Sequence, residues 1–158
     1  MKASFPFPDV VLKGFRAGHP REVLRHMTDA LQLAHGVDGE ALTAALMDAE
    51  TAGGSAIGDG VAVVSARVPS SLMPHQRLAA FAVLDKPVSF RGVENHPCDL
   101  VYVLISPDDQ AQAHLRDLSS VIRTMRDRDF LDRLRLAGSS DRAAGLFRAR
   151  GIAQSQAA

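Results

Sequence analysis

The stretch Gly53-Gly54-Ser55-Ala56-Ile57-Gly58-Asp59-Gly60-Val61-Ala62-Val63-Val64-Ser65-Ala66-Arg67 has four glycines within eight residues, followed directly by an apolar, β-branched run. Glycine permits backbone conformations that other residues rarely adopt, and a short apolar run of this kind is typical of a buried strand. The stretch therefore predicts a tightly bent loop that leads into a strand and delivers Ser65 to the far end of that strand.

Length and composition favour one compact domain over residues 1–150 with a C-terminal tail over 151–158. The chain has 158 residues, of which 46% are hydrophobic, enough to bury about two thirds of the unfolded surface. Lys plus Arg and Asp plus Glu are equal at 18 each, which argues against nucleic acid or an anionic membrane as the partner. A single cysteine, the lack of a long apolar run and a polar N-terminus predict a cytoplasmic protein without membrane insertion.

Strand and helix patterns predict an α/β fold with a mixed sheet between helical layers. Short apolar runs predict strands at 9–15, 61–64, 78–84 and 99–105, and an edge strand at 86–90, where Pro87 cannot donate to an interior ladder. Apolar residues at helical spacing predict five helices: from Pro20 to Gly36, after Asp38, from Pro107 as the longest helix, from about 130 to Gly138, and a short one after Ser139 that ends in a frayed tail.

The helix after Pro107 has a predicted buried stripe made of Leu115, Leu118, Val121, Ile122 and Met125. The charged residues of the same segment fall largely outside this stripe; they are Arg116, Asp117, Arg123 and Arg126. His114 lies at the border of the stripe, where it can face a cleft beside the sheet.

The glycine stretch resembles the active-site segment of the fructose/mannitol-type enzyme IIA domains of the bacterial phosphotransferase system, especially the nitrogen-regulatory branch. That family has the pattern Gly-Ile-Gly-Asn-Gly-Ile-Ala-Ile-Pro-His-Gly-Lys, in which the histidine accepts phosphate from a small phosphocarrier protein. Here Ser65 occupies the histidine position, Val64 the preceding proline, and Ala49 the place of an upstream arginine.

Two further segments carry the resemblance, which spans roughly residues 8 to 148. The run from Phe90 to Leu100 is similar to the family's Phe-Asp-x-x-Asp-Asn-x-Pro-Val-Asp-Leu, and Pro107 to Leu118 is similar to a helix in which the family has its second active-site histidine, here His114. The resemblance implies a three-layer α/β/α sandwich with a mixed central sheet.

The resemblance and the missing histidine together predict a degenerate regulatory domain, not an enzyme, that acts by protein–protein contact. A neutral imidazole is a good phosphoryl acceptor near pH 7, whereas a serine hydroxyl without a base is a weak nucleophile. Partners implied by the family are the phosphocarrier protein, sensor kinases and regulated transporters.

Two alternatives stay open from the sequence. In one, the chain is a working phosphocarrier that uses another residue, with His75 as the substitute because it is the nearest histidine downstream of Ser65. In the other, the old cleft binds a small ligand, with Gly58, Asp59, Gly60 and Arg67 beside Ser65 and His114 as ligand-binding residues. A serine hydrolase is disfavoured because Ser65 lies outside a Gly-x-Ser-x-Gly elbow.

No metal or cofactor is predicted. Glu94, His96 and Cys98 point one way along an extended segment and Asp99 the other, and no second group supplies the usual ligand spacing. Gly58-Asp59-Gly60 lacks the third glycine of a dinucleotide fingerprint, and no Gly-Lys-Ser/Thr follows it.

Overall fold

The computed structural model describes residues 5–73, 77–92 and 96–157, and side chains as far as Gly151. It contains five strands, five α-helices and one 3₁₀ turn within these ranges. In chain order they are β1 Val10–Phe15, α1 Pro20–His35, α2 Gly39–Gly53, β2 Ala56–Gly58, β3 Val61–Val68, the turn Ser70–Leu72, β4 Leu78–Phe90, β5 His96–Pro107, α3 Ala111–Thr124, α4 Arg128–Leu136 and α5 Ser140–Ala157.

The five strands form one mixed sheet in the order β1-β4-β5-β3-β2. β1 is parallel to β4 and β3 is parallel to β5, whereas β4 pairs antiparallel with β5 and β2 antiparallel with β3. β5 therefore lies in the middle of the sheet, as its long apolar run predicts. β2 has only three residues and pairs with the first part of β3.

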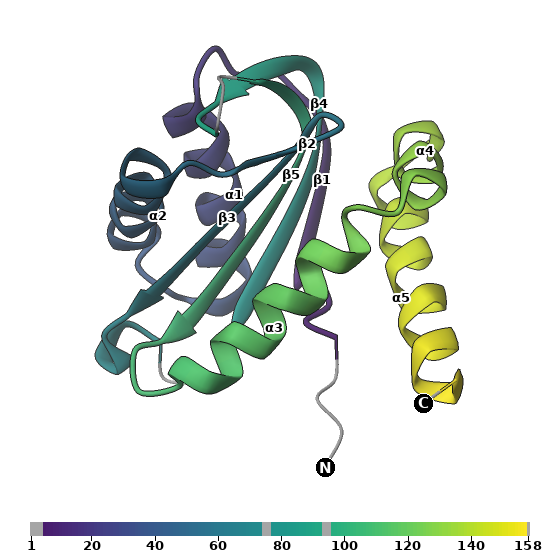
Figure 1. Cartoon of the computed structure of the whole chain (residues 1–158). Helices are drawn as coiled ribbons and strands as arrows, with labels where there is room; N and C mark the ends of the chain where they lie inside the picture. Colours follow the sequence, from purple (N-terminus) through teal and green to yellow (C-terminus); the bar gives the residue numbers. More distant parts are fainter. Residues whose placement is uncertain (1–4, 74–76, 93–95, 158) are drawn as a thin grey trace.

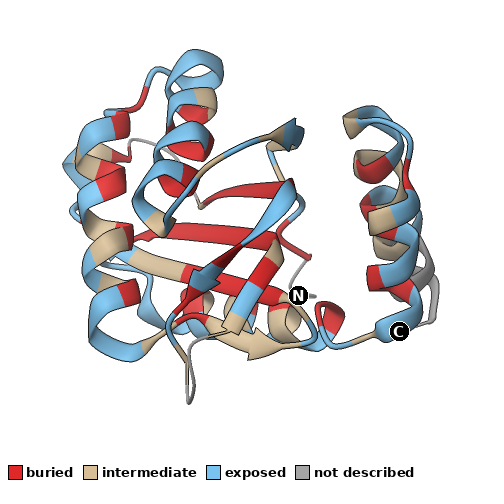
Figure 2. Cartoon of the chain, turned by 90° about the horizontal axis from the view of Figure 1, so that it is seen from above, coloured by how far each residue is buried: buried red, intermediate tan, exposed pale blue. Residues whose placement is uncertain are grey.

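Helices cover both faces of the sheet. Figure 1 shows α1 and α2 on one side and α3, α4 and α5 on the other, and Figure 2 shows the mostly buried strands between these layers. Alternate residues of β3 supply the two apolar cores: Ala62 and Val64 pack with α1 and α2, and Val61 and Val63 pack with α3 and α4. The predicted three-layer sandwich is confirmed.

Residues 86–90 are not the separate edge strand that the sequence predicts. They continue β4, and Val88 to Phe90 pair antiparallel with His96 to Cys98 of β5 after a shift in register. Pro87 nevertheless has no strand partner on the β1 side, because β1 pairs only with the first part of β4 and does not reach it.

Two helix predictions are also wrong in length. α3 begins at Ala111, not at Pro107, because β5 extends through Pro107 and Gln110 takes the N-cap position. α3 has 14 residues and is shorter than α5, which has 18 and continues as helix to Ala157 through the predicted frayed end.

The buried face of α3 is rotated relative to the prediction. His114, Asp117, Val121 and Thr124 are the buried positions, whereas Leu115 is 63% exposed. Polar side chains thus replace leucine at the start of the face that meets the sheet, and those polar residues define the candidate site.

Candidate functional site

Ser65 lies near the carboxyl end of β3, on the face of the sheet that α3 covers. Ala62, Val64, Ala66 and Val68 point to the core under α1 and α2, so the alternation of a strand places Ser65 and Arg67 on the opposite face. Ser65 is half-buried and Arg67 is exposed. Within the described residues, the Ser65 hydroxyl makes no hydrogen bond.

His114 and Ser106 form a buried polar pair on the same face. Ser106 is the second-last residue of β5 and lies opposite Arg67 in the parallel register of β3 and β5. His114 Nδ1 is 2.8 Å from Ser106 Oγ, and the two residues are only 7% and 2% exposed. The hydrogen bond ties the first turn of α3 to the end of β5.

Burial lowers the pKa of His114 below its ordinary value, and the positive charge of Arg67 lowers it further, against a smaller opposing effect of Asp117. Arg67 Nη1 donates to the Asp108 carbonyl at 3.4 Å, which places the guanidinium at the connection between β5 and α3. His114 is therefore a neutral imidazole at pH 7.

Asp117 lies one turn along α3 from His114 and is paired with Arg77. Arg77 Nη1 donates to both carboxylate oxygens, at 3.3 and 3.1 Å, and Asp117 is 4% exposed. Burial raises the pKa of the Asp117 carboxyl more than the Arg77 guanidinium lowers it. Sequence reasoning missed Ser106, Asp117 and Arg77. A serine directly after the apolar run 100–105 is the signal that points to the first.

The glycine loop lies at the other end of β3. Gly60 precedes Val61, so four strand residues lie between it and Ser65, a distance of about 16 Å along the strand. The predicted ligand-binding set is thus divided: Arg67 accompanies Ser65 and His114, whereas Gly58, Asp59 and Gly60 lie apart from them.

Contacts with Arg135 of α4 explain why the loop needs glycine. Asp59 has a left-handed φ of 56° and Gly60 one of 78°. A Cβ on Gly60 would come within 2.6 Å of Arg135 Nη2 and 2.8 Å of Asp99 Oδ1. Arg135 donates to both carboxylate oxygens of Asp99, at 2.9 and 2.8 Å, and to the Asp59 carbonyl at 2.6 Å. The loop is held by α4 as part of the fold.

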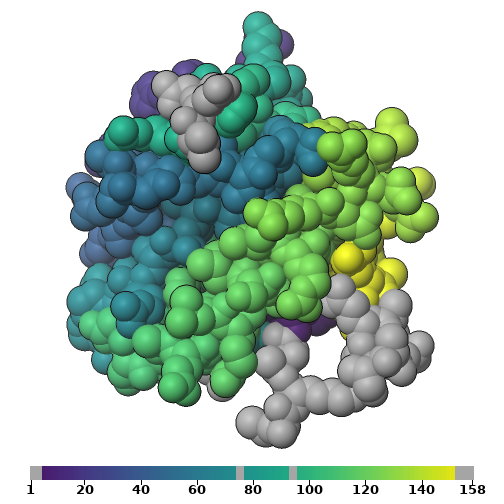
Figure 3. Space-filling model, viewed as in Figure 1, coloured from purple at the N-terminus to yellow at the C-terminus, as the bar shows by residue number. Residues whose placement is uncertain are grey.

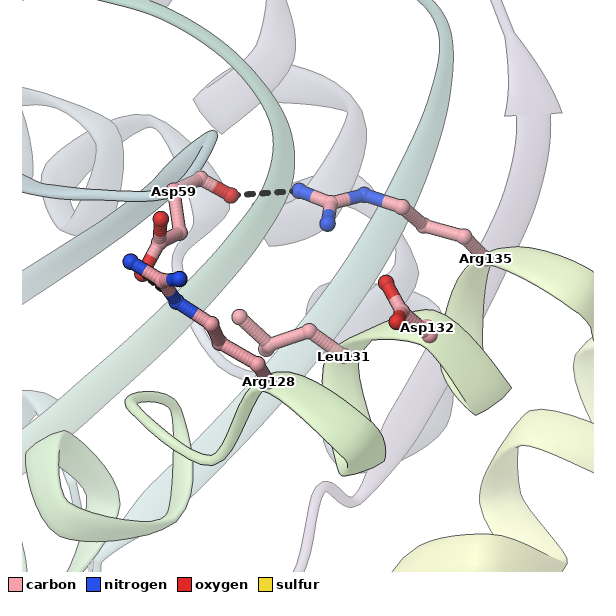
Figure 4. A pocket seen from close by; sticks show the side chains of 5 residues that line it. All are labelled: Asp59, Arg128, Leu131, Asp132 and Arg135. Atoms are coloured by element: carbon pink, nitrogen blue, oxygen red, sulfur yellow. Dashed lines mark hydrogen bonds and ion pairs between the residues drawn. The ribbon is translucent and has the colours of Figure 1, made fainter.

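An open pocket of about 240 Å³ lies beside this loop (Figure 4). Its lining residues are Asp59, Arg128, Leu131, Asp132 and Arg135. Arg128 Nε is 3.4 Å from the Asp59 carboxylate, and Arg135 is bound to Asp99. Because the arginines already face carboxylates, the pocket has no excess positive charge with which to select an anion.

The sequence also offered His75, Glu94 and Cys98 as candidate site residues. His75 and Glu94 lie outside the described residues. Burial raises the pKa of the Cys98 thiol to about 11, so this cysteine is neither a thiolate nucleophile nor a ready metal ligand at pH 7. In the parts of the chain that the structure describes, no three ligand-type side chains are grouped as a metal ion would require.

Comparison with known families identifies this arrangement. Residues 9–149 match the family described as "Phosphoenolpyruvate-dependent sugar phosphotransferase system, EIIA 2". The chain belongs to this family. The match takes in the glycine loop, β3 and α3 of this EIIA 2 domain, and so contains Ser65 and His114.

The curated relatives are nitrogen regulatory proteins. That of Bradyrhizobium diazoefficiens is 27% identical over 128 residues, which cover 81% of this chain and 82% of the relative. That of Escherichia coli is 31% identical over 97 residues, which cover 61% of this chain and 58% of the relative.

Solved structures share the fold of this EIIA 2 domain. The nitrogen regulatory protein IIA-Ntr from Neisseria meningitidis aligns with a TM-score of 0.77 at 19% identity, over 87% of this chain and 92% of that one. The mannitol enzyme IIA of Escherichia coli aligns with a TM-score of 0.69 at 20% identity, over 87% and 94%. Among the described residues, none of the helices is long and apolar enough to span a membrane.

Proposed function

We propose that this EIIA 2 domain is a regulatory protein of the nitrogen-regulatory type that does not carry a phosphoryl group and acts by binding other proteins. The observation that carries the proposal is the environment of Ser65: its hydroxyl stands where the family resemblance predicts the phosphoacceptor, and no described residue accepts a hydrogen bond from it. A serine hydroxyl becomes a nucleophile only when a base removes its proton. No described residue supplies that activation to Ser65.

The buried position of His114 argues against this residue as a substitute acceptor. Its ring is neutral, which suits a nucleophile, but Nδ1 is engaged with Ser106 and the residue is only 7% exposed. A phosphoryl group that comes from a second protein must approach in line with the attacking nitrogen, with room for its oxygens. The packing of His114 between β5 and α3 leaves too little room for this approach.

Protein contact is the activity that remains for such a domain. A solved neighbour of this fold is an enzyme IIA in complex with a phosphorylated enzyme IIB, both from Escherichia coli. That complex supports the view that this fold presents a protein-binding surface. A chain that is never phosphorylated would bind its partners in one constant state, independent of the phosphoenolpyruvate supply.

The test is phosphate uptake measured by intact mass. The full chain is incubated with phosphoenolpyruvate and the two upstream carrier proteins of the phosphotransferase system, with a phosphorylatable IIA-type nitrogen regulatory protein in parallel as the positive control. We expect the control to gain the mass of one phosphoryl group and this chain to gain none.

Acid-labile phosphate on the wild-type chain would overturn the proposal. In that case His75→Ala and His114→Gln locate the acceptor, because loss of uptake in only one variant assigns the carrier role to that histidine. Acid-stable phosphate that disappears in Ser65→Ala would also overturn it, since Ser65 would then be the acceptor.

A further inference from the structure

The outer side of α3 has an apolar stripe that the fold leaves partly exposed. Leu115, Leu118 and Ile122 follow one another at i, i+3 and i+7, the spacing of one side of a helix. Leu115 is 63% exposed, and Leu118 and Ile122 are only partly buried at the border of the core. A single exposed leucine is common on protein surfaces, whereas three apolar side chains in a row form a continuous patch of the kind that binds partners.

A basic stripe runs beside the apolar one. Arg116 directly follows Leu115 and Arg123 directly follows Ile122, so the two stripes lie about 100° apart around the helix axis. Both arginines are exposed and form no ion pair with a described residue. The only acidic residue of α3, Asp117, is buried and bound by Arg77. The exposed face of α3 is therefore cationic, although the net charge of the chain is zero.

Two buried polar contacts hold α3 in place on the sheet. His114 in the first turn is bound to Ser106, and Asp117 in the second turn is bound to Arg77. In Figure 3 the green surface of α3 crosses the front of the molecule, and its outer side is open to solvent. A surface that is fixed before the partner arrives loses little conformational entropy on binding.

We propose that this face of α3 docks an amphipathic helix of a partner protein, one that has an apolar stripe flanked by acidic residues. The apolar stripe of the partner covers the three apolar side chains of α3, a mode of recognition that uses helical spacing on both sides. Its acidic residues meet Arg116 and Arg123, because carboxylates accept the forked hydrogen bonds of arginine. The inference rests on the proposed function, in which the domain acts by binding proteins, and adds the chemistry of the partner.

The spacing of the two arginines sets the spacing of the acids in the partner. Arg116 and Arg123 are seven residues apart, about 10.5 Å along the helix axis. A partner helix with acidic residues seven positions apart therefore engages both arginines at once. Nucleic acid is also anionic, but single strands bind chiefly by stacking their bases on aromatic side chains, and α3 has no Phe, Tyr or Trp. An aliphatic stripe beside the arginines favours a protein.

The probe is a synthetic three-heptad peptide with the repeat Glu-Leu-Ala-Ala-Leu-Glu-Gln, blocked at both ends and labelled with a fluorophore. Its leucines form one stripe, its glutamates flank that stripe, and each glutamate recurs after seven residues. Fluorescence anisotropy with the full chain at low salt measures binding. We expect saturable binding that weakens as salt is added, because part of the attraction is between exposed charges.

Charge reversal on both sides of the contact is the decisive experiment. Arg116→Glu/Arg123→Glu should weaken binding of the glutamate peptide about tenfold or more, because like charges then face each other. The same variant should bind the counterpart peptide in which every glutamate is lysine, which the wild type should not bind. The matched control is Arg16→Glu/Arg21→Glu, the same charge change on exposed residues at the start of α1, across the sheet from α3. This control should bind both peptides as the wild type does.

Leu115→Gln tests the apolar stripe without a change of charge. It removes exposed apolar area that the partner would cover, so binding of the glutamate peptide should weaken about fivefold. Binding of an oligothymidylate, which has charge but no apolar stripe, should be weaker than that of the peptide and unchanged by Leu115→Gln. Circular dichroism of each variant checks that the fold is kept.

Three results would overturn the proposal: a glutamate peptide that does not bind the wild type, equal weakening in the α1 control, or an oligothymidylate that binds as tightly as the peptide. The last would show that the face is a basic surface without preference for a protein. Phosphate uptake is measured separately. Uptake by a chain that still binds the peptide contradicts only the proposed function, and a chain that takes up no phosphate and ignores the peptide contradicts only this inference.

Discussion

His114 of α3 and Ser106 of β5 share a buried hydrogen bond, 2.8 Å between Nδ1 and Oγ, at the end of the sheet where Ser65 and Arg67 lie. Polar groups that are buried without a partner cost more free energy than a hydrogen bond contributes. The pair therefore fixes where α3 starts on the sheet, and with it the position of the face that α3 presents to solvent.

Ser106→Ala should destabilise the fold by about 1–2 kcal/mol, because it leaves His114 Nδ1 buried without a partner. Urea denaturation at pH 7 measures the free energy of unfolding. Ser119→Ala on the exposed face of the same helix is the control and should change it by less than about 0.5 kcal/mol. Equal stability of the two variants would show that the pair contributes nothing.

The lowered pKa of His114 predicts a loss of stability in mild acid. Its folded-state pKa lies below the ordinary value of 6.5, so the unfolded chain binds the proton more readily. The stabilisation is complete above pH 6.5 and is lost as the pH falls from 6.5 toward the folded-state value.

His114→Gln keeps a partner for Ser106 but cannot titrate. The difference in unfolding free energy between wild type and His114→Gln should therefore shrink from about pH 7.5 to about pH 5.5. The other five histidines are common to both proteins and cancel in the difference. A difference that is constant over this range would show that His114 does not titrate with a lowered pKa.

The fold was predictable because its signals are local and redundant. The run 100–105 within β5 and the start of β4 are uninterrupted and apolar, as is typical of strands with both faces covered. α1 has a proline at its first turn and a glycine at its end. Gly36 takes the left-handed conformation that ends α1, with φ 71°. The boundaries of α3 and α5 were not predictable in the same way, because neither has a strong local signal at the end in question.

The site was only half predictable, for a physical reason. The apolar period of α3 points to Leu115 as buried and Asp117 as exposed, but Arg77 from the start of β4 neutralises Asp117 and Ser106 pairs with His114. Arg77 lies 40 residues from Asp117, so no local pattern contains that pair. Ser106 is only eight residues from His114, but it belongs to the strand before α3 and not to the helix whose period was read.

Arg135→Ala should destabilise the glycine loop and the whole fold. The change leaves the Asp99 carboxylate without its two hydrogen bonds and removes the donor to the Asp59 carbonyl. We expect a loss of about 1–3 kcal/mol in unfolding free energy, and faster hydrogen exchange at Gly60 and Asp99. The neighbouring Arg133→Ala, exposed on the same helix, should have little effect. Unchanged exchange in Arg135→Ala would refute the role of this contact.

On our proposal that Ser65 stands at the family's phosphoacceptor position and Ala49 of α2 at that of its upstream arginine, Ser65→His should recover only part of phosphoryl transfer. The variant supplies the nucleophile but not the arginine. One preorganised charged donor to a transferring group typically contributes about a hundredfold in rate, so Ser65→His should accept phosphate slowly and Ser65→His/Ala49→Arg faster.

α2 lies over the face of the sheet opposite to Ser65, so an arginine at position 49 has to reach around the β3 edge. Ala49→Lys is the control, because lysine is also long and cationic but lacks the forked donors of arginine. Time courses of intact mass with the upstream carriers measure the rates. Equal rates for Ser65→His with and without the arginine would show that the missing arginine does not limit transfer. Full activity of Ser65→His alone would show that the serine is the only change that separates this chain from a phosphocarrier.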